Sequence, residues 1–362
     1  MSIRPAIVAD RGTMNDYAEF LRRFLVGLTD ESCESALICP PDEGAVHVLS
    51  PSVKLIHYPI LKIPLLMAQN RKSVLGQLEK FKPTVLHCFS PSRARLTRYL
   101  ARQLDIPYVF TFSSLSKKFP RPSVSSSHCG GLIASSKPIA ENLKSTFSKF
   151  FDIVEQVNIG TFVEDSCACF CRPGRFASLI ITGPLDNDIP FEPLLNAIRH
   201  LVIDGYELAL AIVGSGPAEK KIHELVKALG ISQAVTIVGD IQPLRNALAG
   251  ADIFIQPRRT NEINFQLLEA MSVGMVIAAS CDTVDDILIE NETAVFFDPH
   301  DELRVYACLQ NLLSKRQEAK KIALAGQNYL REFHSVSKNI AALTEIYRNT
   351  QQWYRERTTG YS

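Results

Sequence analysis

The stretch IFIQPRRTNEINFQLLEAMSVGMVIAAS, residues 253–280, predicts the order of elements on which the fold of this sequence depends. Its apolar start, Ile253 to Ile255, is too short for a helix and therefore indicates a buried strand. A polar turn follows, and the pattern then predicts a helix from Phe265 to Ser272. Gly274 ends this helix, and an apolar run at 276–279 predicts the next buried strand. Strand, helix and strand in this order are the repeating unit of a parallel α/β sheet.

The start of the predicted helix has the features of a phosphate site. Asn261 or Asn264 is the expected N-cap, because an Asn side chain readily accepts hydrogen bonds from the first amides of a helix. The amides of Phe265 and Gln266 would face a ligand at the positive end of the helix dipole. We therefore expect Asn264, Phe265 and Gln266 to contact a phosphate group.

The same stretch resembles the retaining GT-B glycosyltransferases of family 4. In this place those enzymes carry Glu, seven residues and a second Glu, followed by Ala-Met, a small residue and Gly. The run from Glu269 to Ser272, together with Gly274, matches the second half of this pattern, whereas the first Glu falls on Asn261. The resemblance implies that the Glu269 carboxylate binds the ribose of a nucleotide-sugar donor and that Asn261 contacts the donor sugar.

The resemblance also implies the GT-B fold, in which two Rossmann-like, doubly wound α/β domains are followed by a C-terminal helix that crosses back to the first. We predict an acceptor-side domain at 1–165 and a nucleotide-sugar-binding domain at 176–335. A helical pattern covers 323–357, and 336–362 is predicted to return to the first domain. Apolar runs that alternate with helical patterns in both halves agree with doubly wound sheets.

Four glycines are candidates for contacts with the donor. Gly12 lies in a turn before a helix predicted at 16–28, where related enzymes usually carry two glycines that let the backbone approach the donor phosphates. A single Gly in this place also fits a tight turn that binds nothing. In the second half, the turns that contain Gly214, Gly216 and Gly239 resemble the donor-side loops of the family.

Two positions of the first half concern the catalytic chemistry. His87 ends a strand predicted at 84–88, in a place that resembles the family's strand ending in His. Many family members have a further His that lines the donor sugar, where this sequence has Ser113, and a hydroxyl cannot replace an imidazole as a charged partner. His87 is a candidate for part of that role from the neighbouring strand, but a structural role in the core is the favoured interpretation of a His at a strand end.

Basic residues of the first half are candidates for contacts with the acceptor. Arg95 and Arg98 lie on a predicted helix, and Lys117 and Lys118 follow a predicted strand. If both groups lie at the same edge of the sheet, they would hold an anionic acceptor, although a solvated helix face explains the arginines equally well. A basic segment at 58–81 could contact a membrane surface, but packing of its leucines on the sheet is the favoured interpretation.

Two cations that active relatives use are absent from this sequence. Those relatives carry an Arg and a Lys that neutralise the diphosphate as the bond to the sugar breaks, and Pro184 and Ile189 stand in their places. Their loss removes a large electrostatic contribution to the departure of the leaving group. Arg258 and Arg259 are the candidate replacements, because they precede the predicted phosphate-binding helix and a guanidinium binds phosphate well.

Two hypotheses about function follow. The first is a hexosyltransferase that moves a sugar, with retention, from a nucleotide-diphosphate donor to an unknown acceptor, which is a glycan, a lipid-linked molecule or a small molecule. The second is a non-catalytic relative that binds nucleotide or glycan, or that partners an active glycosyltransferase. We favour the enzyme because the nucleotide side of the pattern is kept. Against it stand four altered polar positions: Ser113, Pro184, Ile189 and Asn261.

Length and composition set the remaining expectations. A chain of 362 residues predicts two domains, and a net charge of +1 gives no reason to expect nucleic acid as a partner. We expect no signal peptide and no membrane span, and the nine cysteines suggest reduced thiols in a cytoplasm, with peripheral membrane contact as an option. Cys167, Cys169 and Cys171 lack the usual spacing and the His neighbours of a zinc site, so a linker is favoured over a metal site and no cofactor or metal is expected.

Overall fold

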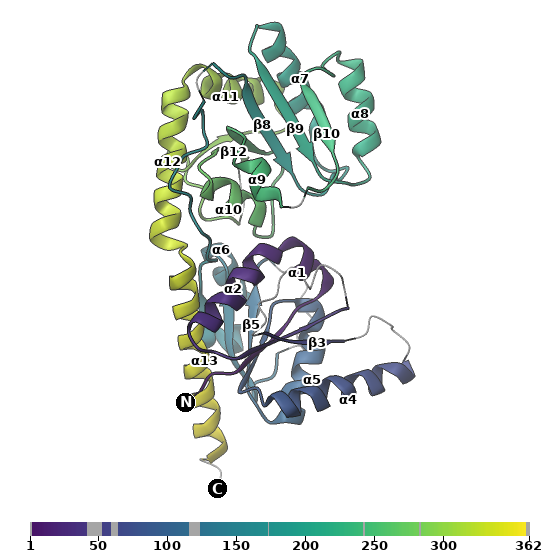
Figure 1. Cartoon of the computed structure of the whole chain (residues 1–362), viewed down its shortest axis with the longest axis vertical. Coiled ribbons are helices and arrows are strands. Elements are labelled where there is room, and N and C mark those ends of the chain that lie inside the picture. The colour runs from purple at the N-terminus through teal and green to yellow at the C-terminus, as the bar shows by residue number, and fades with distance from the viewer. Residues whose placement is uncertain are drawn as a thin grey trace. The chain divides into compact units, whose positions relative to one another are not determined.

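The computed structural model describes residues 2–41, 53–58, 64–115, 124–172, 174–241, 243–281 and 284–359. These residues form two compact units, which Figure 1 shows and which are described here one at a time. Unit 1 comprises Met1–Gly160 and His334–Ser362, and unit 2 comprises Thr161–Phe333. Each unit is built on one parallel sheet with helices on both faces, so the predicted α/β class is confirmed.

The sheet of unit 1 has seven strands in the order β3-β2-β1-β4-β5-β6-β7, and every pair of neighbours is parallel. Strands in the middle of the sheet are buried on both faces, which is why they appear in the sequence as continuous apolar runs. The strands are β1 (Pro5–Val8), β2 (Ser35–Cys39), β3 (Val53–His57), β4 (Val85–Cys88), β5 (Tyr108–Phe112), β6 (Cys129–Ala134) and β7 (Val154–Gln156).

Helices of unit 1 connect these strands and cover the sheet. The helix predicted at 16–28 is in fact two helices that meet at Tyr17, and Phe20, Phe24 and Leu28 form part of the buried face of the second one, as their spacing predicts. The helices are α1 (Arg11–Asp16), α2 (Ala18–Asp30), α4 (Pro64–Phe81), α5 (Ala94–Leu104), α6 (Lys137–Thr146) and α13 (Val336–Thr359), with short 3-10 turns η1 (Pro91–Arg93) and η3 (Ser148–Ile153).

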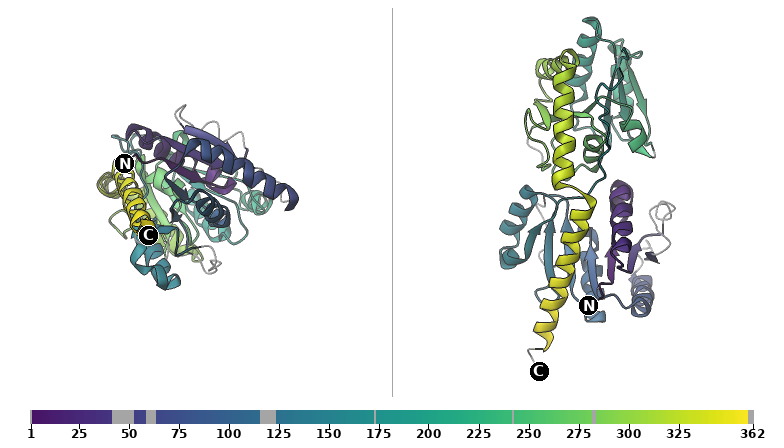
Figure 2. Two further views of the ribbon diagram at one scale, coloured as in Figure 1. Left: turned by 90° about the horizontal axis from the view of Figure 1, so that it is seen from below. Right: turned by 60° about the vertical axis from the view of Figure 1, so that its left-hand side comes forward.

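The last helix, α13, packs within unit 1 against its sheet and against α2, and Figure 2 shows it in yellow. Gly27 of α2 permits the close approach, because a Cβ in its place would lie 2.7 Å from Cγ1 of Ile340. Near the other end of α13, the buried Tyr354 donates a hydrogen bond of 2.6 Å to Oδ1 of Asp105. The C-terminal helix therefore completes the same unit as the N-terminal strands.

The sheet of unit 2 has six parallel strands in the order β10-β9-β8-β11-β12-β13. Its strands are β8 (Ala177–Thr182), β9 (Leu208–Val213), β10 (Val235–Val238), β11 (Ile253–Gln256), β12 (Val276–Ser280) and β13 (Ala294–Phe297). Its helices are α7 (Phe191–Ile203), α8 (Glu219–Ala228), α9 (Leu244–Leu248), α10 (Phe265–Ser272), α11 (Glu302–Ser314) and α12 (Arg316–Phe333). Within the described ranges, none of the helices combines the length and the apolar character that a passage through a bilayer requires.

The helical pattern at 323–357 forms parts of two helices, α12 and α13, and α13 begins at Val336. His334 leaves the helical path: it is buried, and its Nδ1 lies 3.0 Å from the carbonyl oxygen of Ile159. Ser335 then starts the next helix, because its hydroxyl accepts the amide of Lys338 at 3.2 Å.

Candidate functional site

The order of strands in unit 2 marks one edge of its sheet as a place to bind a ligand. Strands β8 and β11 are neighbours, but β9 lies on the far side of β8 whereas β12 lies on the far side of β11. The loops that leave the carboxyl ends of β8 and β11 therefore turn away from each other. In open α/β sheets, ligands bind in the crevice that such a change of direction opens. We call this the carboxyl edge of unit 2.

Glycines shape the turns at this edge. Gly183 follows β8 with φ +121°, and Gly214 follows β9 with φ +145°, a backbone region that residues with a side chain rarely adopt. A Cβ on Gly214 would lie only 2.0 Å from the carbonyl oxygen of Gly183, and one on Gly216 would lie 2.4 Å from that of Leu185. The predicted donor-side glycines Gly214 and Gly216 are thus needed to pack one turn against the other. Gly239 differs, because apart from its own atoms and those of its chain neighbours no atom of the described residues lies within 4 Å of the place of its Cβ.

The N-terminus of α10 lies after β11 at the same edge. Asn264 is its N-cap, and its Oδ1 accepts the amides of Gln266 at 3.0 Å and Leu267 at 3.2 Å. The helix bounds and the cap agree with the prediction from the sequence. The prediction that the Gln266 amide contacts phosphate needs correction, however, because the cap already uses this amide. The side chain of Gln266, unlike its amide, lies near the turn that follows β8: its Oε1 is 3.8 Å from the position that a Cβ on Gly183 would take.

Two buried polar atoms at this edge have no hydrogen-bond partner among the described residues. Gln256, the last residue of β11, is 3% exposed; its Oε1 accepts Nδ2 of Asn264 at 2.9 Å, but its Nε2 donates to nothing. The hydroxyl of Thr182, the last residue of β8, is likewise unpartnered. The strand register pairs Phe254 with Ile180, so its continuation places Gln256 beside Thr182. Unsatisfied buried polar groups cost about 1–3 kcal/mol each, so a ligand or a water molecule that supplies the missing acceptor is favoured at both positions.

The turn between β11 and α10 is fixed by a buried carboxylate. Asp285 is 3% exposed, and it accepts the amide of Asn264 at 3.1 Å and the hydroxyl of Thr260 at 3.2 Å. In the same turn Asn261 and Arg259 are exposed, whereas Arg258 reaches back to Asp186 with an Nη1–Oδ2 distance of 3.0 Å. Arg258 therefore places its charge beside the turn that follows β8, where Pro184 lies.

Glu269 lies on α10 and is held by an arginine that sequence reasoning missed. Its Oε2 accepts Nη1 of Arg245 at 2.5 Å, and its Oε1 accepts the hydroxyl of Thr161 at 3.2 Å. Arg245 also donates to Glu164 and to the hydroxyl of Ser272, both at 2.9 Å. Burial opposes the charge of Arg245, but the two carboxylates outweigh it and raise the pKa of the guanidinium. The carboxylate of Glu269 is therefore held and oriented by an ion pair.

His87 of unit 1 does not have the position of a catalytic residue, and that prediction is corrected here. Its side chain is fully buried; Nδ1 lies 2.5 Å from the hydroxyl of Tyr347 and Nε2 lies 2.6 Å from that of Thr111. The ring also stacks on Phe89, with a centroid distance of 4.1 Å. Burial lowers the pKa of His87 to about 3, so the imidazole is neutral. His87 joins α13 to the sheet of unit 1.

We expect the neutral state of His87 to give unit 1 a measurable pH dependence. Because folding lowers the pKa from 6.5 to about 3, the stabilisation is complete above pH 6.5 and is lost as the pH falls towards 3. Between pH 8 and pH 5 this amounts to about 2 kcal/mol. His87→Phe should be less stable at pH 8, by about 2–4 kcal/mol, since Tyr347 and Thr111 lose a partner.

Urea unfolding at pH 8 and pH 5 measures both effects. The free energy of unfolding of His87→Phe should change less between the two pH values than that of the unchanged protein. His223→Gln, at an exposed site on α8, is the control and should keep the full change. If the free energy of unfolding changed equally between pH 8 and pH 5 in His87→Phe and in the unchanged protein, the assignment of this pH dependence to His87 would be contradicted.

The remaining candidates in unit 1 are dispersed. Gly12 lies in the first turn of α1 rather than in a turn before a helix, so its predicted position is wrong. Arg95 is exposed in the first turn of α5, whereas Arg98 lies near Tyr108, where its charge opposes the burial that raises the pKa of the phenol. Tyr108 begins β5, so the two arginines do not gather at one edge of the sheet. Lys117 and Lys118 lie outside the described residues.

The three clustered cysteines of unit 2 do not form a metal site. The thiol of Cys167 donates to the carbonyl of Gly274 at 3.2 Å, Cys169 is buried in the core, and Cys171 is exposed. No group of three potential metal ligands occurs in the part of the chain that the structure describes.

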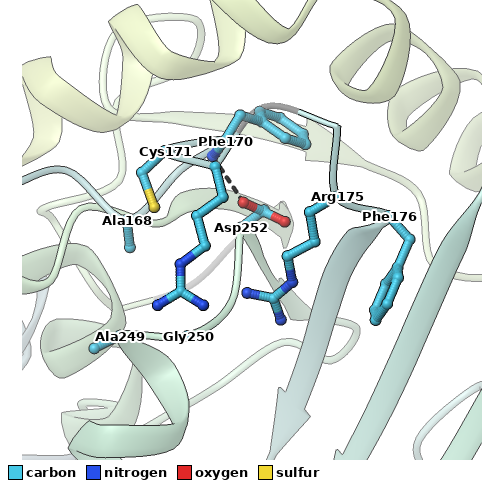
Figure 3. A pocket seen from close by; sticks show the side chains of 9 residues that line it. Ala168, Phe170, Cys171, Arg175, Phe176, Ala249, Gly250 and Asp252 are labelled. Carbon is cyan, nitrogen blue, oxygen red and sulfur yellow. Dashed lines mark hydrogen bonds between the residues drawn. The ribbon is translucent and has the colours of Figure 1, made fainter.

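A small pocket beside Cys171 is shown in Figure 3. At its base, the Asp252 carboxylate accepts the amides of Phe170 at 2.7 Å and Ser178 at 2.8 Å. Asp252 precedes β11, so the pocket lies at the edge of the sheet opposite to the carboxyl edge. Both carboxylate oxygens are occupied by backbone amides, which indicates a structural brace.

Comparison with known proteins agrees with this geometry. Residues 177–315 match the family model described as Glycosyl transferases group 1. The sulfoquinovosyl transferase SQD2 of Arabidopsis thaliana is 25% identical over 296 residues, which are 74% of this chain and 56% of that protein. A GDP-mannose-dependent mannosyltransferase of Mycolicibacterium smegmatis is 25% identical over 148 residues, 38% of either chain. The chain thus spans less than two thirds of these curated relatives.

Solved structures resemble almost the whole chain. A glycosyltransferase from Rickettsia africae ESF-5 superposes with a TM-score of 0.81 and 14% identity, over 96% of this chain and 98% of that one. HepE of Anabaena, solved with UDP and glucose, gives a TM-score of 0.79 and 12% identity, over 95% of this chain and 98% of that one. At such low identity, these similarities establish the fold alone.

Proposed function

We propose that this protein is a glycosyltransferase that uses a nucleotide-diphosphate sugar and retains the anomeric configuration, because residues 177–315 match the family model described as Glycosyl transferases group 1 and the chain has the GT-B fold. The observation that carries the proposal is the pair of unpartnered polar atoms, Gln256 Nε2 and Thr182 Oγ1, beside the N-terminus of α10. Donors in such a place suit phosphate oxygens. The complex of HepE with UDP and glucose supports a nucleotide sugar as the donor.

Each residue of the carboxyl edge has a place in this proposal. Glu269 would accept hydrogen bonds from the two ribose hydroxyls, because a carboxylate has lone pairs beyond those that Arg245 and Thr161 use. Gln256 and Thr182 would donate to the diphosphate, and the exposed Asn261 would contact the sugar. Protein groups and the helix dipole would carry the charge, so no metal is proposed.

Arg258 would stabilise the leaving diphosphate in place of the two cations that the sequence lacks. Its guanidinium lies 3.0 Å from Asp186, in the turn after β8 where active relatives carry an Arg. A preorganised cation beside developing charge lowers the barrier to departure.

The same ion pair favours a second candidate, a non-catalytic relative that binds a nucleotide or glycan or partners an active glycosyltransferase. Asp186 compensates the charge of Arg258, which weakens its effect on a leaving group.

Incubation with UDP-, GDP- and ADP-sugars separates the two functions. Slow release of the nucleotide would support the enzyme, and NMR of the product would then report whether the anomeric configuration is retained. Tight binding without release would support the non-catalytic relative.

We expect a nucleotide diphosphate to raise the melting temperature of the protein, because it binds the folded state alone. In Gln256→Met the affinity should fall about tenfold, which corresponds to the loss of one hydrogen bond to a charged group. Gln233→Met, at an exposed site before β10, is the matched control and should bind normally. A well-folded protein that no nucleotide stabilises would contradict the proposed site.

A further inference from the structure

The sheet of unit 1 has its own change of direction, between β1 and β4. These strands are parallel neighbours, whereas β2 lies on the far side of β1 and β5 lies on the far side of β4. The segments that leave their carboxyl ends, residues 9–10 and 89–93, therefore border the crevice where open α/β sheets bind ligands.

The two segments are tied together through Asp10. Its Oδ2 accepts the hydroxyl of Ser92 at 2.6 Å and that of Ser90, and its Oδ1 accepts the amide and the hydroxyl of Thr13, each at 2.9 Å. Burial alone would raise the pKa of Asp10, but these hydrogen bonds outweigh it and the pKa is lowered. The carboxylate is thus an ionised brace that orients two serine hydroxyls.

Arg93 is the last residue of the second segment and has no ion-pair partner among the described residues. Its Cζ stands 4.5 Å from the centroid of the Tyr58 ring, and Tyr58 is itself fixed by a hydrogen bond of 2.8 Å from its hydroxyl to the carbonyl of Ala9. Nε of Arg93 is buried and has no hydrogen-bond partner in the part of the chain that the structure describes. The face of the guanidinium is therefore covered, while no described carboxylate pairs with the donors on its edge.

A guanidinium that is stacked in this way presents two parallel N–H groups in its plane, a geometry that matches phosphate oxygens. A buried donor without an acceptor is costly, so a ligand that supplies the acceptor is favoured. The geometry points to Arg93 as the residue that binds a phosphate monoester on the acceptor. This inference rests on the proposed transferase function, and it gives the acceptor a chemical class.

Isothermal titration of the full-length protein with matched probes tests the inference. Glucose 6-phosphate is compared with glucose, and vesicles of phosphatidylcholine with phosphatidic acid are compared with phosphatidylcholine alone. We expect the phosphorylated probe of one pair to bind about tenfold tighter or more than its neutral partner, as a bidentate charged contact implies. The pair that shows this preference assigns the phosphate to a soluble sugar or to a lipid headgroup.

Variants locate the preference. Arg93→Gln should remove it, and Arg93→Lys should keep only part, because Lys retains the charge without the planar fork. Arg102→Gln makes the same change of charge at an exposed site on α5, the helix that follows Arg93, and should keep the preference. An equal loss in Arg102→Gln would show general attraction to a basic surface and would overturn the inference.

Nucleotide binding by unit 2, measured in the same samples, separates this inference from the proposed function. If Arg93→Gln binds nucleotide normally but the protein never distinguishes a phosphorylated probe from its neutral partner, the inference falls and the proposed function stands. If no nucleotide binds to the unchanged protein, the proposed function falls. Inorganic phosphate that binds as tightly as glucose 6-phosphate would show an anion site without acceptor recognition and would also overturn the inference.

Discussion

Glu269→Ala is expected to weaken the binding of a nucleotide diphosphate on the order of 100-fold, the effect of losing two hydrogen bonds to a charged acceptor. Glu269 is half-buried on α10, and its carboxylate is oriented by Arg245 at 2.5 Å and by Thr161 at 3.2 Å. A ribose ligand needs this orientation, because its two adjacent hydroxyls must meet one carboxylate together. Calorimetric titration with UDP, GDP and ADP would measure the loss and would name the preferred base.

Three further variants make this prediction specific. Glu269→Gln keeps the shape of the side chain but removes its charge, so its affinity should lie between those of the unchanged protein and Glu269→Ala. Arg245→Gln should cost about tenfold, because the carboxylate remains but is no longer oriented. Glu207→Gln, at an exposed site before β9, is the control and should bind normally. If Glu269→Ala binds nucleotide as well as the unchanged protein does, Glu269 belongs to the ion pair alone.

Gly214→Ala is expected to have the largest effect on stability, a loss of about 3–5 kcal/mol in the free energy of unfolding of unit 2. Two independent costs add up at this position. Its φ of +145° strains any residue with a side chain, and a Cβ would lie 2.0 Å from the carbonyl oxygen of Gly183, so one of the two turns must move. Because both turns lie at the carboxyl edge, where the nucleotide is proposed to bind, nucleotide binding should be lost as well.

Urea unfolding followed by circular dichroism, together with hydrogen exchange of the amides of β8 and β9, would measure the effect of Gly214→Ala. Gly239→Ala is the matched control, because apart from its chain neighbours no described residue lies within 4 Å of its Cβ position. This control should change the free energy of unfolding by less than about 1 kcal/mol. Similar losses of unfolding free energy in the two variants would show that the close approach at Gly214 does not determine the cost of adding a side chain there.

Local patterns in the sequence predicted most of the architecture. Strands β2, β5 and β9 are mainly apolar runs, in agreement with the alternation of apolar runs and helical patterns that predicts a doubly wound sheet. Helix α10 has its predicted bounds, since an Asn cap and a terminal Gly mark both ends. Tertiary contacts overrode the pattern at His334, where a carbonyl from a distant segment interrupts the helical pattern.

The candidate site was less predictable, because its chemistry depends on pairs of residues that are far apart in the sequence. Arg245 and Glu269 meet through the packing of α9 on α10, and no local pattern indicates that contact. Gln256 was a detectable signal, as the single polar residue of a buried strand, but its partners depend on the cap of the next helix. For His87, the family pattern indicated a candidate catalytic residue, and the packing of its buried side chain agrees with the structural role that the sequence interpretation favoured.

The placement of α13 has a consequence for the order of folding during synthesis. All strands of unit 1 precede Gly160, but the helix that supplies Tyr347 to His87 is translated only after the whole of unit 2. A nascent chain that has reached Phe333 can bury the core of unit 2 while the face of β4, β5 and β6 still lacks its covering helix. Domains generally fold as units as they leave the ribosome, so unit 2 should become protease-resistant before unit 1. The N-terminal half of this protein is thus synthesised first and completed last.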